Sequence, residues 1–374
     1  MRTIILKTIL LLSLFIILAC EKNESDNNNP TVEITSPDEG DQYEQGQNVT
    51  IIADANDVDG NLQKVKFFID NYLINEDTES PYRYVWSTSA AALGDHILKV
   101  EAVDTEQASS IDEVTIGIYT EIEITPLEMI LVEAGSYDMG CMSNDQYSCF
   151  NNELPIHSVS VDSFYISKHE ITNFHFAEFL NNINVDSLGV YQDEVIIDMQ
   201  SGNVQIKYSN GEFKPLNGKE NFPVIEVSWF GAKAFCEYHG GRLPTEAEWE
   251  FAARGGNESD TTLFAGGNDI NIVAWYGGNA GNAPHEVGTR QANELGIYDM
   301  SGNVWEWCND WYEADYYAVS PVNNPTGPET GTYKVLRGGI WNGEGVYCRV
   351  SYRDFSYSTI TNNANGLRLV KDVN

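Results

Sequence analysis

One segment, residues 295–310, limits what this chain can fold into more than any other. Its sequence LGIYDMSGNVWEWCND sets tryptophans against a small acidic turn that contains glycine. Asp299, Gly302 and Glu306 alternate there with backbone positions that offer carbonyl oxygens, and Ca²⁺ prefers such a set of carboxylates and carbonyls. A spacing of this kind is a hypothesis for a metal site. The alternative is a tryptophan-rich core turn whose acids face water.

Length and charge narrow the class of protein. The chain has 374 residues, which suits two domains. Its formal net charge of −35 excludes nucleic acid as a partner, because binding a phosphate backbone requires clustered Lys and Arg. The same acidity suits an extracellular surface that binds cations. With 8 Trp, 20 Tyr and 15 Phe, the chain has enough apolar side chains for a folded core.

The N-terminus has the features of an export signal. Residues 1–20 begin with Arg2 and Lys7 and continue with an apolar run too short to span a bilayer permanently. The run ends in Ile17-Leu18-Ala19-Cys20, which resembles a bacterial lipobox and implies lipidation of Cys20. Residues 21–30 then form a polar tether. We therefore predict a lipid-anchored protein of the bacterial cell envelope, on the outer membrane or cell surface; a plain secretory peptide is the alternative.

Five further cysteines leave at least one thiol outside any intramolecular disulfide. Cys141 and Cys149 are close enough in sequence to close a small loop, and we predict a disulfide between them. The histidines are scattered and the sequence contains no Cys-x-x-Cys pair, so a zinc site is not expected.

Residues 31–120 alternate in the way expected of a β-sandwich. Turn signals separate about seven short runs, at 31–35, 48–55, 65–69, 72–74, 82–86, 96–103 and 113–119. Segments such as VEITSP, ANDVDG and VKFFID resemble bacterial immunoglobulin-like modules, which implies a spacer or adhesion domain without catalysis. Asp57 and Asp59 either hold a cation or, more simply, form a turn.

Residues 126–372 have a different character, rich in Gly and Trp, with mixed helix and strand signals. Thr172 and Ser228 are suitable N-caps for two helices, and Thr245 with Glu248 forms a capping box for a third. We expect a hairpin entry at 132–140, a strand at 223–229 and a surface hairpin insertion at 184–215.

These blocks resemble the sulfatase-modifying-factor family, which includes the formylglycine-generating enzymes. The resemblance spans nearly the whole of this domain, in the family's order, and rests on residues 170–173, 223–229, 242–256, 296–310, 335–339 and 366–370. It implies an irregular α+β fold of the C-type-lectin kind. The whole chain is thus expected to be multidomain, with an all-β sandwich followed by this α+β fold.

The resemblance also implies a calcium site in residues 295–310. In family members this turn binds Ca²⁺, and the matching ligands here are the Asp299 and Glu306 side chains with the Gly302 and Val304 carbonyls. Such an ion would be structural, because it allows carboxylates to be buried in a loop that lacks regular backbone pairing.

The resemblance leaves enzymatic activity open. Oxidase members use O₂ to convert a substrate cysteine to formylglycine and hold Cu(I) between two cysteines, as suits soft thiolate ligands. The later cysteine matches Cys348, but the earlier one falls at Gly343, which has no ligand atom. Cys348 is then either a structural remnant or the catalytic thiol of an unusual site, with Arg349 supplying some of the positive charge that activates thiols.

We favour a calcium-stabilised, non-oxidase binding or scaffold module; the alternative is an O₂-dependent oxidase that acts on a protein cysteine through Cys348, with copper as cofactor. Trp305, Trp341 and Arg349 are the candidate ligand-binding residues, although aromatic core packing explains any single ring equally well. The expected partners are the membrane, through the N-terminal lipid anchor, and an envelope protein, peptide or glycan.

Overall fold

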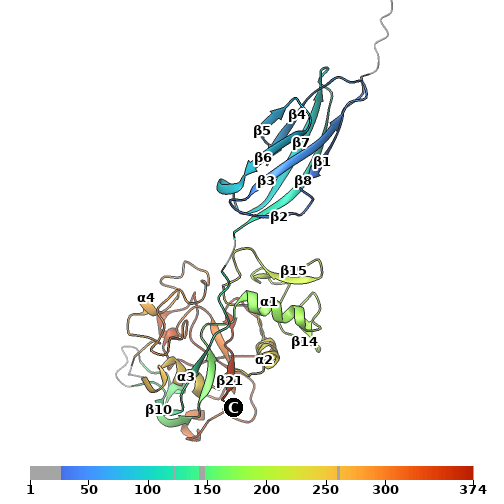
Figure 1. Cartoon of the computed structure of the whole chain (residues 1–374). Coiled ribbons are helices and arrows are strands. Elements are labelled where there is room, and N and C mark those ends of the chain that lie inside the picture. Colours follow the sequence, from blue (N-terminus) through green and yellow to red (C-terminus); the bar gives the residue numbers. More distant parts are fainter. Residues whose placement is uncertain (1–26, 121–122, 143–147, 259–261, 374) are drawn as a thin grey trace, which may run out of the picture. The chain divides into compact units, whose positions relative to one another are not determined.

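The chain divides into two compact units, residues 1–121 and 122–374, which are considered separately. The computed structural model describes residues 27–120, 123–142, 148–258 and 262–373 (Figure 1). The predicted signal peptide and Cys20 lie outside these residues. Among the described residues no helix combines the length and apolar character needed to cross a bilayer.

The first unit is built from eight strands in two sheets (Figure 1). One sheet has the order β1-β3-β6 and the other β2-β8-β7-β4-β5. The strands are β1 (Thr31–Ser36), β2 (Gln42–Glu44), β3 (Asn48–Asn56), β4 (Leu62–Ile69), β5 (Tyr72–Asp77), β6 (Tyr82–Ser87), β7 (Gly94–Asp104) and β8 (Ser109–Tyr119), with a 3-10 turn η1 (Thr88–Ala90) after β6.

Alternating side chains of both sheets form the core of this unit. In β4, Val65, Phe67 and Ile69 are buried while their neighbours are partly exposed, as a period of two requires. The β4–β5 hairpin turns at Asp70 and Asn71, which both have positive φ, as tight two-residue hairpin turns demand. The predicted sandwich is confirmed; the short strand β2 was not anticipated.

The second unit consists of short strands and helices joined by long loops. Its strands are β9 (Met129–Val132), β10 (Gly135–Met139), β11 (His157–Val161), β12 (Phe164–Ser167), β13 (Val190–Tyr191), β14 (Glu194–Val195), β15 (Ile206–Ser209), β16 (Glu212–Pro215), β17 (Trp305–Trp311), β18 (Lys334–Arg337), β19 (Asp354–Ser356), β20 (Asn365–Gly366) and β21 (Val370–Asp372). The largest sheet has the order β19-β18-β17-β20.

Helices of the second unit begin where the capping residues predict. They are α1 (Asn173–Asn182), α2 (Trp229–Tyr238), α3 (Glu246–Ala253) and α4 (Ile270–Val273), with 3-10 turns η2 (Asn151–Glu153), η3 (Gly256–Glu258), η4 (Tyr316–Ala318) and η5 (Gly345–Cys348). The Thr172 and Ser228 side chains cap α1 and α2, and Thr245 with Glu248 forms the capping box of α3. These predictions are confirmed.

One local prediction is wrong. Residues 223–228 form no strand but only single bridges at Pro223 and Val227, because their neighbours are loops and not strands, and Trp229 already begins α2. The segment 132–140 does lead into an antiparallel pair, since β10 pairs with the next strand, β11, while β9 pairs with β12. The insertion at 184–215 does form hairpins, β13–β14 and β15–β16.

The tryptophan-rich segment, residues 295–310, lies at the centre of the second unit. It supplies β17, which pairs with β18 on one side and β20 on the other, and Trp307 on this strand is completely buried. The predicted disulfide between Cys141 and Cys149 is present. Cys236, Cys308 and Cys348 are free and buried.

Candidate functional site

Two of the predicted ligand-binding residues, Trp341 and Arg349, lie close in sequence to the predicted catalytic residue Cys348. Trp341 and the third predicted ligand-binding residue, Trp305 on β17, are each only 6% exposed. The Trp341 indole N–H donates to the Asn363 carbonyl at 3.0 Å. Both rings are therefore mostly core, and any ligand would contact the more exposed rings that pack on Trp305.

Four rings, which we call the aromatic face, pack together around Trp305. Its ring centroid lies 5.9 Å from that of Tyr352, which is 5.0 Å from Tyr347 and 5.5 Å from Phe150. Phe150 is 45% exposed, and the two tyrosines are half-buried. Partly exposed aromatic clusters of this kind contact peptides or sugars in many binding sites.

Arg349 supports this face from the interior of the protein. It is completely buried, and its guanidinium Nη2 donates to Glu153 Oε1 at 2.7 Å while Nη1 donates to Oε2 at 3.1 Å. This pair joins η2, next to Phe150, to η5, next to Tyr352. In this structure Arg349 therefore holds the two walls of the aromatic face together and does not present its charge to solvent.

Cys348 is completely buried at the end of η5, in an apolar cluster with Leu263, Phe264, Val273 and Ala274. Burial raises the pKa of its thiol to about 12. Because the thiolate is the nucleophile and metal ligand, this setting opposes the activation that an oxidase needs. Gly339, at φ 94°, approaches it so closely that an added Cβ would lie 2.8 Å from the sulfur.

The position that should carry the second copper ligand is packed. A Cβ on Gly343 would lie 2.5 Å from Ile340 Cγ2 and 3.0 Å from Tyr347 Cδ2. Burial also raises the pKa of the Cys308 thiol well above its usual value. The residues present therefore do not fit a two-thiolate copper(I) site.

The predicted calcium residues lie in a buried group that we call the Arg368 cluster, made of Glu170, Asp299, Glu306 and Arg368. Arg368 contacts both oxygens of Glu306 at 2.8–3.0 Å, and the Trp249 indole N–H donates to Glu306 Oε2 at 2.6 Å. Glu306 is completely buried. Its carboxylate is thus engaged by protein donors and not directed only toward a metal.

The other two carboxylates of the cluster, Asp299 and Glu170, accept hydrogen bonds from neutral donors. Asp299 accepts from the Gly288 N–H at 2.7 Å, and burial raises its pKa to about 6. Glu170 accepts from the Asn303 amide and the Val304 N–H, and burial, followed by the nearby Asp299 and Glu306, raises its pKa well above the usual range.

A hard cation fits this cluster in charge and in ligand chemistry. Three buried carboxylates share one guanidinium, and burying an uncompensated carboxylate is costly. Asp299 and the backbone carbonyls of Gly302 and Val304 are oxygen ligands of the kind that Ca²⁺ prefers. The side chains alone do not form a cage: in the described parts of the chain, the one group of three acidic, Cys or His side chains whose ligand atoms lie within 4.8 Å is Cys141, Cys149 and Glu153.

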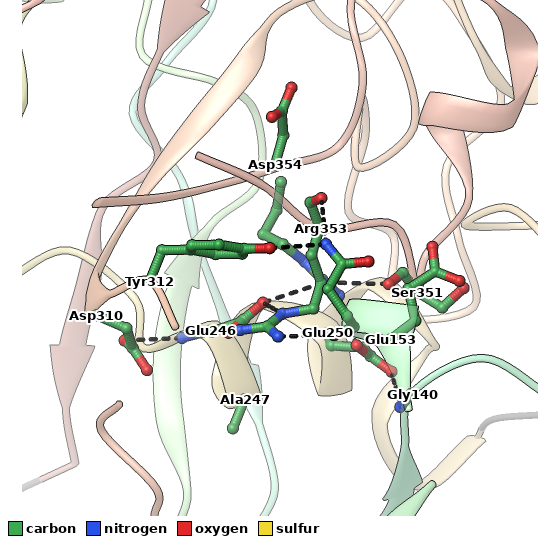
Figure 2. Close-up of polar contacts among 12 residues, drawn as sticks. Gly140, Glu153, Glu246, Ala247, Glu250, Asp310, Tyr312, Ser351, Arg353 and Asp354 are labelled. Carbon is green, nitrogen blue, oxygen red and sulfur yellow. Dashed lines mark hydrogen bonds and ion pairs between the residues drawn. The ribbon is translucent and has the colours of Figure 1, made fainter. Parts of the chain in front are cut away.

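A second buried group, the α3 ion network, adjoins the Arg368 cluster, since its Arg337 on β18 is the register partner of Glu306 on β17. Arg353 donates to both oxygens of Glu246 at 2.7 and 2.9 Å (Figure 2). Arg337 and Arg254 both donate to Glu250. Burial disfavours the charged form of Glu250, but Arg254 and Arg337 outweigh it and hold the pKa below the usual value.

Asp310 lies at the edge of this network, where it accepts from the backbone N–H of Glu246 at 3.0 Å (Figure 2). This contact satisfies a donor in the first turn of α3. Burial, with the nearby Glu246, raises the pKa of Asp310 to about 8.

Sequence reasoning missed the partners of these acids. Glu170, Arg337 and Arg368 were seen only as members of family blocks, yet Glu170 and Arg368 decide how the predicted calcium residues are used, and Arg337 binds the acids of the α3 ion network. A signal was present for the two arginines: each follows apolar residues, as Arg368 does in GLRLV, and buried charges are normally paired.

Comparison with family models agrees with the division into two units. The model described as sulfatase-modifying factor enzyme 1-like domain matches residues 119–373. A bacterial Ig domain model matches residues 30–100.

Individual relatives match the second unit. A serine/threonine-protein kinase pkn1 of Chlamydia pneumoniae is 33% identical over 261 residues, covering 66% of this chain but only 38% of the relative, so the chain spans well under half of that protein. A formylglycine-generating enzyme of Streptomyces coelicolor is 31% identical over 283 residues, covering 65% of this chain and 88% of the relative. Among solved structures, Treponema denticola variable protein 1 is 26% identical with a TM-score of 0.51, covering 67% of this chain and 98% of that one.

Proposed function

The chain belongs to the sulfatase-modifying factor enzyme 1-like domain family through residues 119–373, and we propose that this domain serves as a calcium-stabilised binding module and not as an oxidase. The observation that carries the proposal is the setting of the two copper positions. Cys348 is a buried thiol with its pKa raised to about 12, and position 343 is a glycine packed against Ile340 and Tyr347.

The aromatic face supports a binding role. Phe150, Tyr347 and Tyr352 expose ring surface beside the segment that carries Cys348, while Arg349 and Glu153 fix their backbones from inside. Rings held in this way lose little conformational entropy when a ligand binds, because they are ordered beforehand. The relatives also support a domain with more than one use, since a protein named as a kinase and one named as a formylglycine-generating enzyme both match it.

We place this module in the bacterial envelope. The lipobox at residues 17–20 would anchor the chain to a membrane through Cys20, and the polar tether with the immunoglobulin-like unit would hold the second unit away from it. The partner is then an envelope protein, peptide or glycan that reaches the aromatic face.

Calcium would be held by Asp299 with the Gly302 and Val304 carbonyls, with the charge of Glu170 and Glu306 close by. When bound, it supplies positive charge that the cluster otherwise lacks. The protein's own residues position the carboxylates: Arg368 orients Glu306, and the Glu306 carboxylate accepts a hydrogen bond from the Trp249 indole N–H within the core.

The catalytic alternative can be tested by an oxygen-dependent mass assay. The full chain, supplied with copper, is incubated with a peptide containing Cys-x-Pro-x-Arg under air and under nitrogen. The proposal predicts that the peptide mass stays unchanged under air. Loss of the peptide thiol that requires O₂ and disappears in Cys348→Ser would establish the oxidase instead.

The binding role can be tested by photo-crosslinking. Tyr352 is replaced by a benzophenone amino acid in cells that export the full chain, and Tyr208, exposed on the β15–β16 hairpin, is replaced in a matched control. The proposal predicts a defined crosslinked product from position 352 that is absent from position 208. Identical patterns from both positions would remove the support for a binding face.

A further inference from the structure

The two sulfurs of the Cys141–Cys149 disulfide have different surroundings. Cys141 follows the end of β10 and is completely buried. Its sulfur accepts a hydrogen bond from Arg349 Nη1 at 3.3 Å. Cys149 is half-buried and lies between two exposed residues, Ser148 and Phe150. A nucleophile from solvent can therefore approach Cys149 and not Cys141.

From this asymmetry we propose that the Cys141–Cys149 disulfide undergoes thiol–disulfide exchange with a dithiol reductant. Its redox state would then control how well Phe150, one of the rings of the aromatic face, is ordered. The exchange chemistry stands on the contacts of the disulfide itself. The consequence for ligand binding rests on the proposed function of the aromatic face.

The exchange proceeds in two balanced steps. A thiolate of the reductant attacks Cys149 Sγ, a new S–S bond forms, and the Cys141–Cys149 bond breaks with its electron pair passing to Cys141 Sγ. The second thiol of the reductant, as its thiolate, then attacks the mixed disulfide and releases the Cys149 thiolate. The reductant leaves as its own disulfide, and the protein has gained two electrons; protons from water complete the thiols.

Arg349 favours this direction of cleavage. A thiol with a lower pKa is the better leaving group in disulfide exchange, and a neighbouring guanidinium lowers a thiol pKa. The Arg349 Nη1–H already points at Cys141 Sγ. Glu153 neutralises part of the guanidinium charge, and Glu153 Oε2 and Ser351 Oγ, both at 3.1 Å, share the Nη1 donor with Cys141 Sγ.

The disulfide is connected to the aromatic face by a short chain of contacts. Cys149 precedes Phe150, whose N–H donates to Glu153 Oε2 at 3.1 Å, and the Cys141 N–H donates to the Glu153 carbonyl at 3.1 Å. Glu153 in turn binds Arg349, and the Phe150 ring meets Tyr352 edge-on. Reduction removes the covalent tie at one end of this chain, so Phe150 should lose order while the core remains folded.

The three free thiols of the described residues provide an internal control. Cys236, Cys308 and Cys348 are buried, and burial raises the pKa of each. In the folded protein these thiols should neither exchange nor react with an alkylating reagent during the time in which the Cys141–Cys149 disulfide exchanges.

A trapping experiment tests the site of attack. The full chain, purified in detergent, is treated with reduced glutathione, quenched with an alkylating reagent and mapped by mass spectrometry. We expect glutathione on Cys149 with alkylated Cys141, exceeding the reverse product by about threefold, as a thiol pKa difference of about one unit gives with a Brønsted slope of about 0.5. Equal labelling, the reverse product, or exchange only after denaturation would overturn the proposal.

Hydrogen exchange then tests the coupling without any ligand. Reduction with a dithiol, and separately the Cys141→Ser, Cys149→Ser double variant, should both increase amide exchange at residues 149–153 and 349–352, with α2 serving as an unaffected control. Unchanged exchange in both samples would refute the coupling. This outcome is separate from the crosslinking result at Tyr352, so the inference and the proposed function can fail independently.

Discussion

Two buried charge clusters of the second unit have opposite balances. In the α3 ion network, Glu246 and Glu250 are matched by Arg254, Arg337 and Arg353, and the pKa of Glu250 is lowered. In the Arg368 cluster, three carboxylates share a single guanidinium, and the pKa values of Glu170 and Asp299 are raised.

The difference separates a structural cluster from one that has a use for an external ion. The α3 ion network needs nothing beyond its own side chains, because Glu246 and Glu250 each bind arginine, and Asp310 at its edge accepts from the Glu246 N–H. The Arg368 cluster must either hold protons or bind a cation to relieve its charge. Strand β17 contributes to both groups, with Glu306 in the Arg368 cluster and Asp310 at the edge of the α3 ion network.

The largest expected effect comes from breaking the balanced cluster. Glu250→Gln removes the carboxylate partner of Arg254 and leaves Arg337 only its longer contact with Glu246 at 3.3 Å. Removing one partner of a buried pair costs about 3–5 kcal/mol. Urea unfolding should show this loss whether or not calcium is present. Glu237→Gln, which removes an exposed helical pair with Lys233, should change stability by less than about 0.5 kcal/mol. Equal effects of the two substitutions would contradict the burial argument.

The second expected effect is a pH dependence from Asp299. Its folded pKa is raised from 3.8 to about 6, so the folded state holds the proton more tightly than the unfolded chain. Its contribution is therefore fully present below pH 3.8 and is lost as pH rises through about 6, by about 3 kcal/mol in total. Comparing urea unfolding of the wild type and Asp299→Asn in chelator across this range isolates the effect. A stability difference that does not vary with pH would refute it.

Calcium should produce the third effect, restricted to the Arg368 cluster. Binding to the folded state alone raises its stability by about 2.7 kcal/mol at a hundredfold excess over the dissociation constant. Glu170→Gln mimics the protonated form of this carboxyl, so in chelator it should be nearly neutral, while the shift in melting temperature with calcium should shrink. A wild-type melting curve that is identical with calcium and with chelator would exclude the site.

The smallest expected effect concerns the start of α3. Thr245→Ala removes the side-chain acceptor for the Glu248 N–H, and losing such a cap costs about 1 kcal/mol. Thr245→Ser keeps the hydroxyl and should recover most of the loss in thermal unfolding. If serine were no better than alanine, the effect would come from packing of the threonine methyl group and not from the cap.

Sequence predicted the parts of the fold that local rules control. The strands of the first unit followed from alternation, and the helix starts at Thr172, Ser228 and Thr245 followed from capping chemistry. Residues 223–229 were mispredicted because strand pairing depends on what lies alongside, and loops lie alongside here. The apolar residues of a segment do not indicate whether a strand or a loop will lie beside it.

The candidate site was predicted less completely. The acids Asp299 and Glu306 were found from the sequence, but their partner Arg368 lies 62 residues from Glu306, and no spacing rule pairs charges that far apart. Arg349 was predicted to bind a ligand and is instead bound to Glu153, 196 residues away. Burial depends on the whole fold, so a charged residue that faces inward looks the same in sequence as one that faces water.

The central claim is that this domain lacks the oxidase's metal site, and copper(I) titration of the full chain tests it most directly. With a competing chelator and the Cys141–Cys149 disulfide intact, the account predicts no stoichiometric binding, because Cys348 is a buried thiol and position 343 offers no second ligand. Tight binding of one copper ion per chain that disappears in Cys348→Ser would contradict the account.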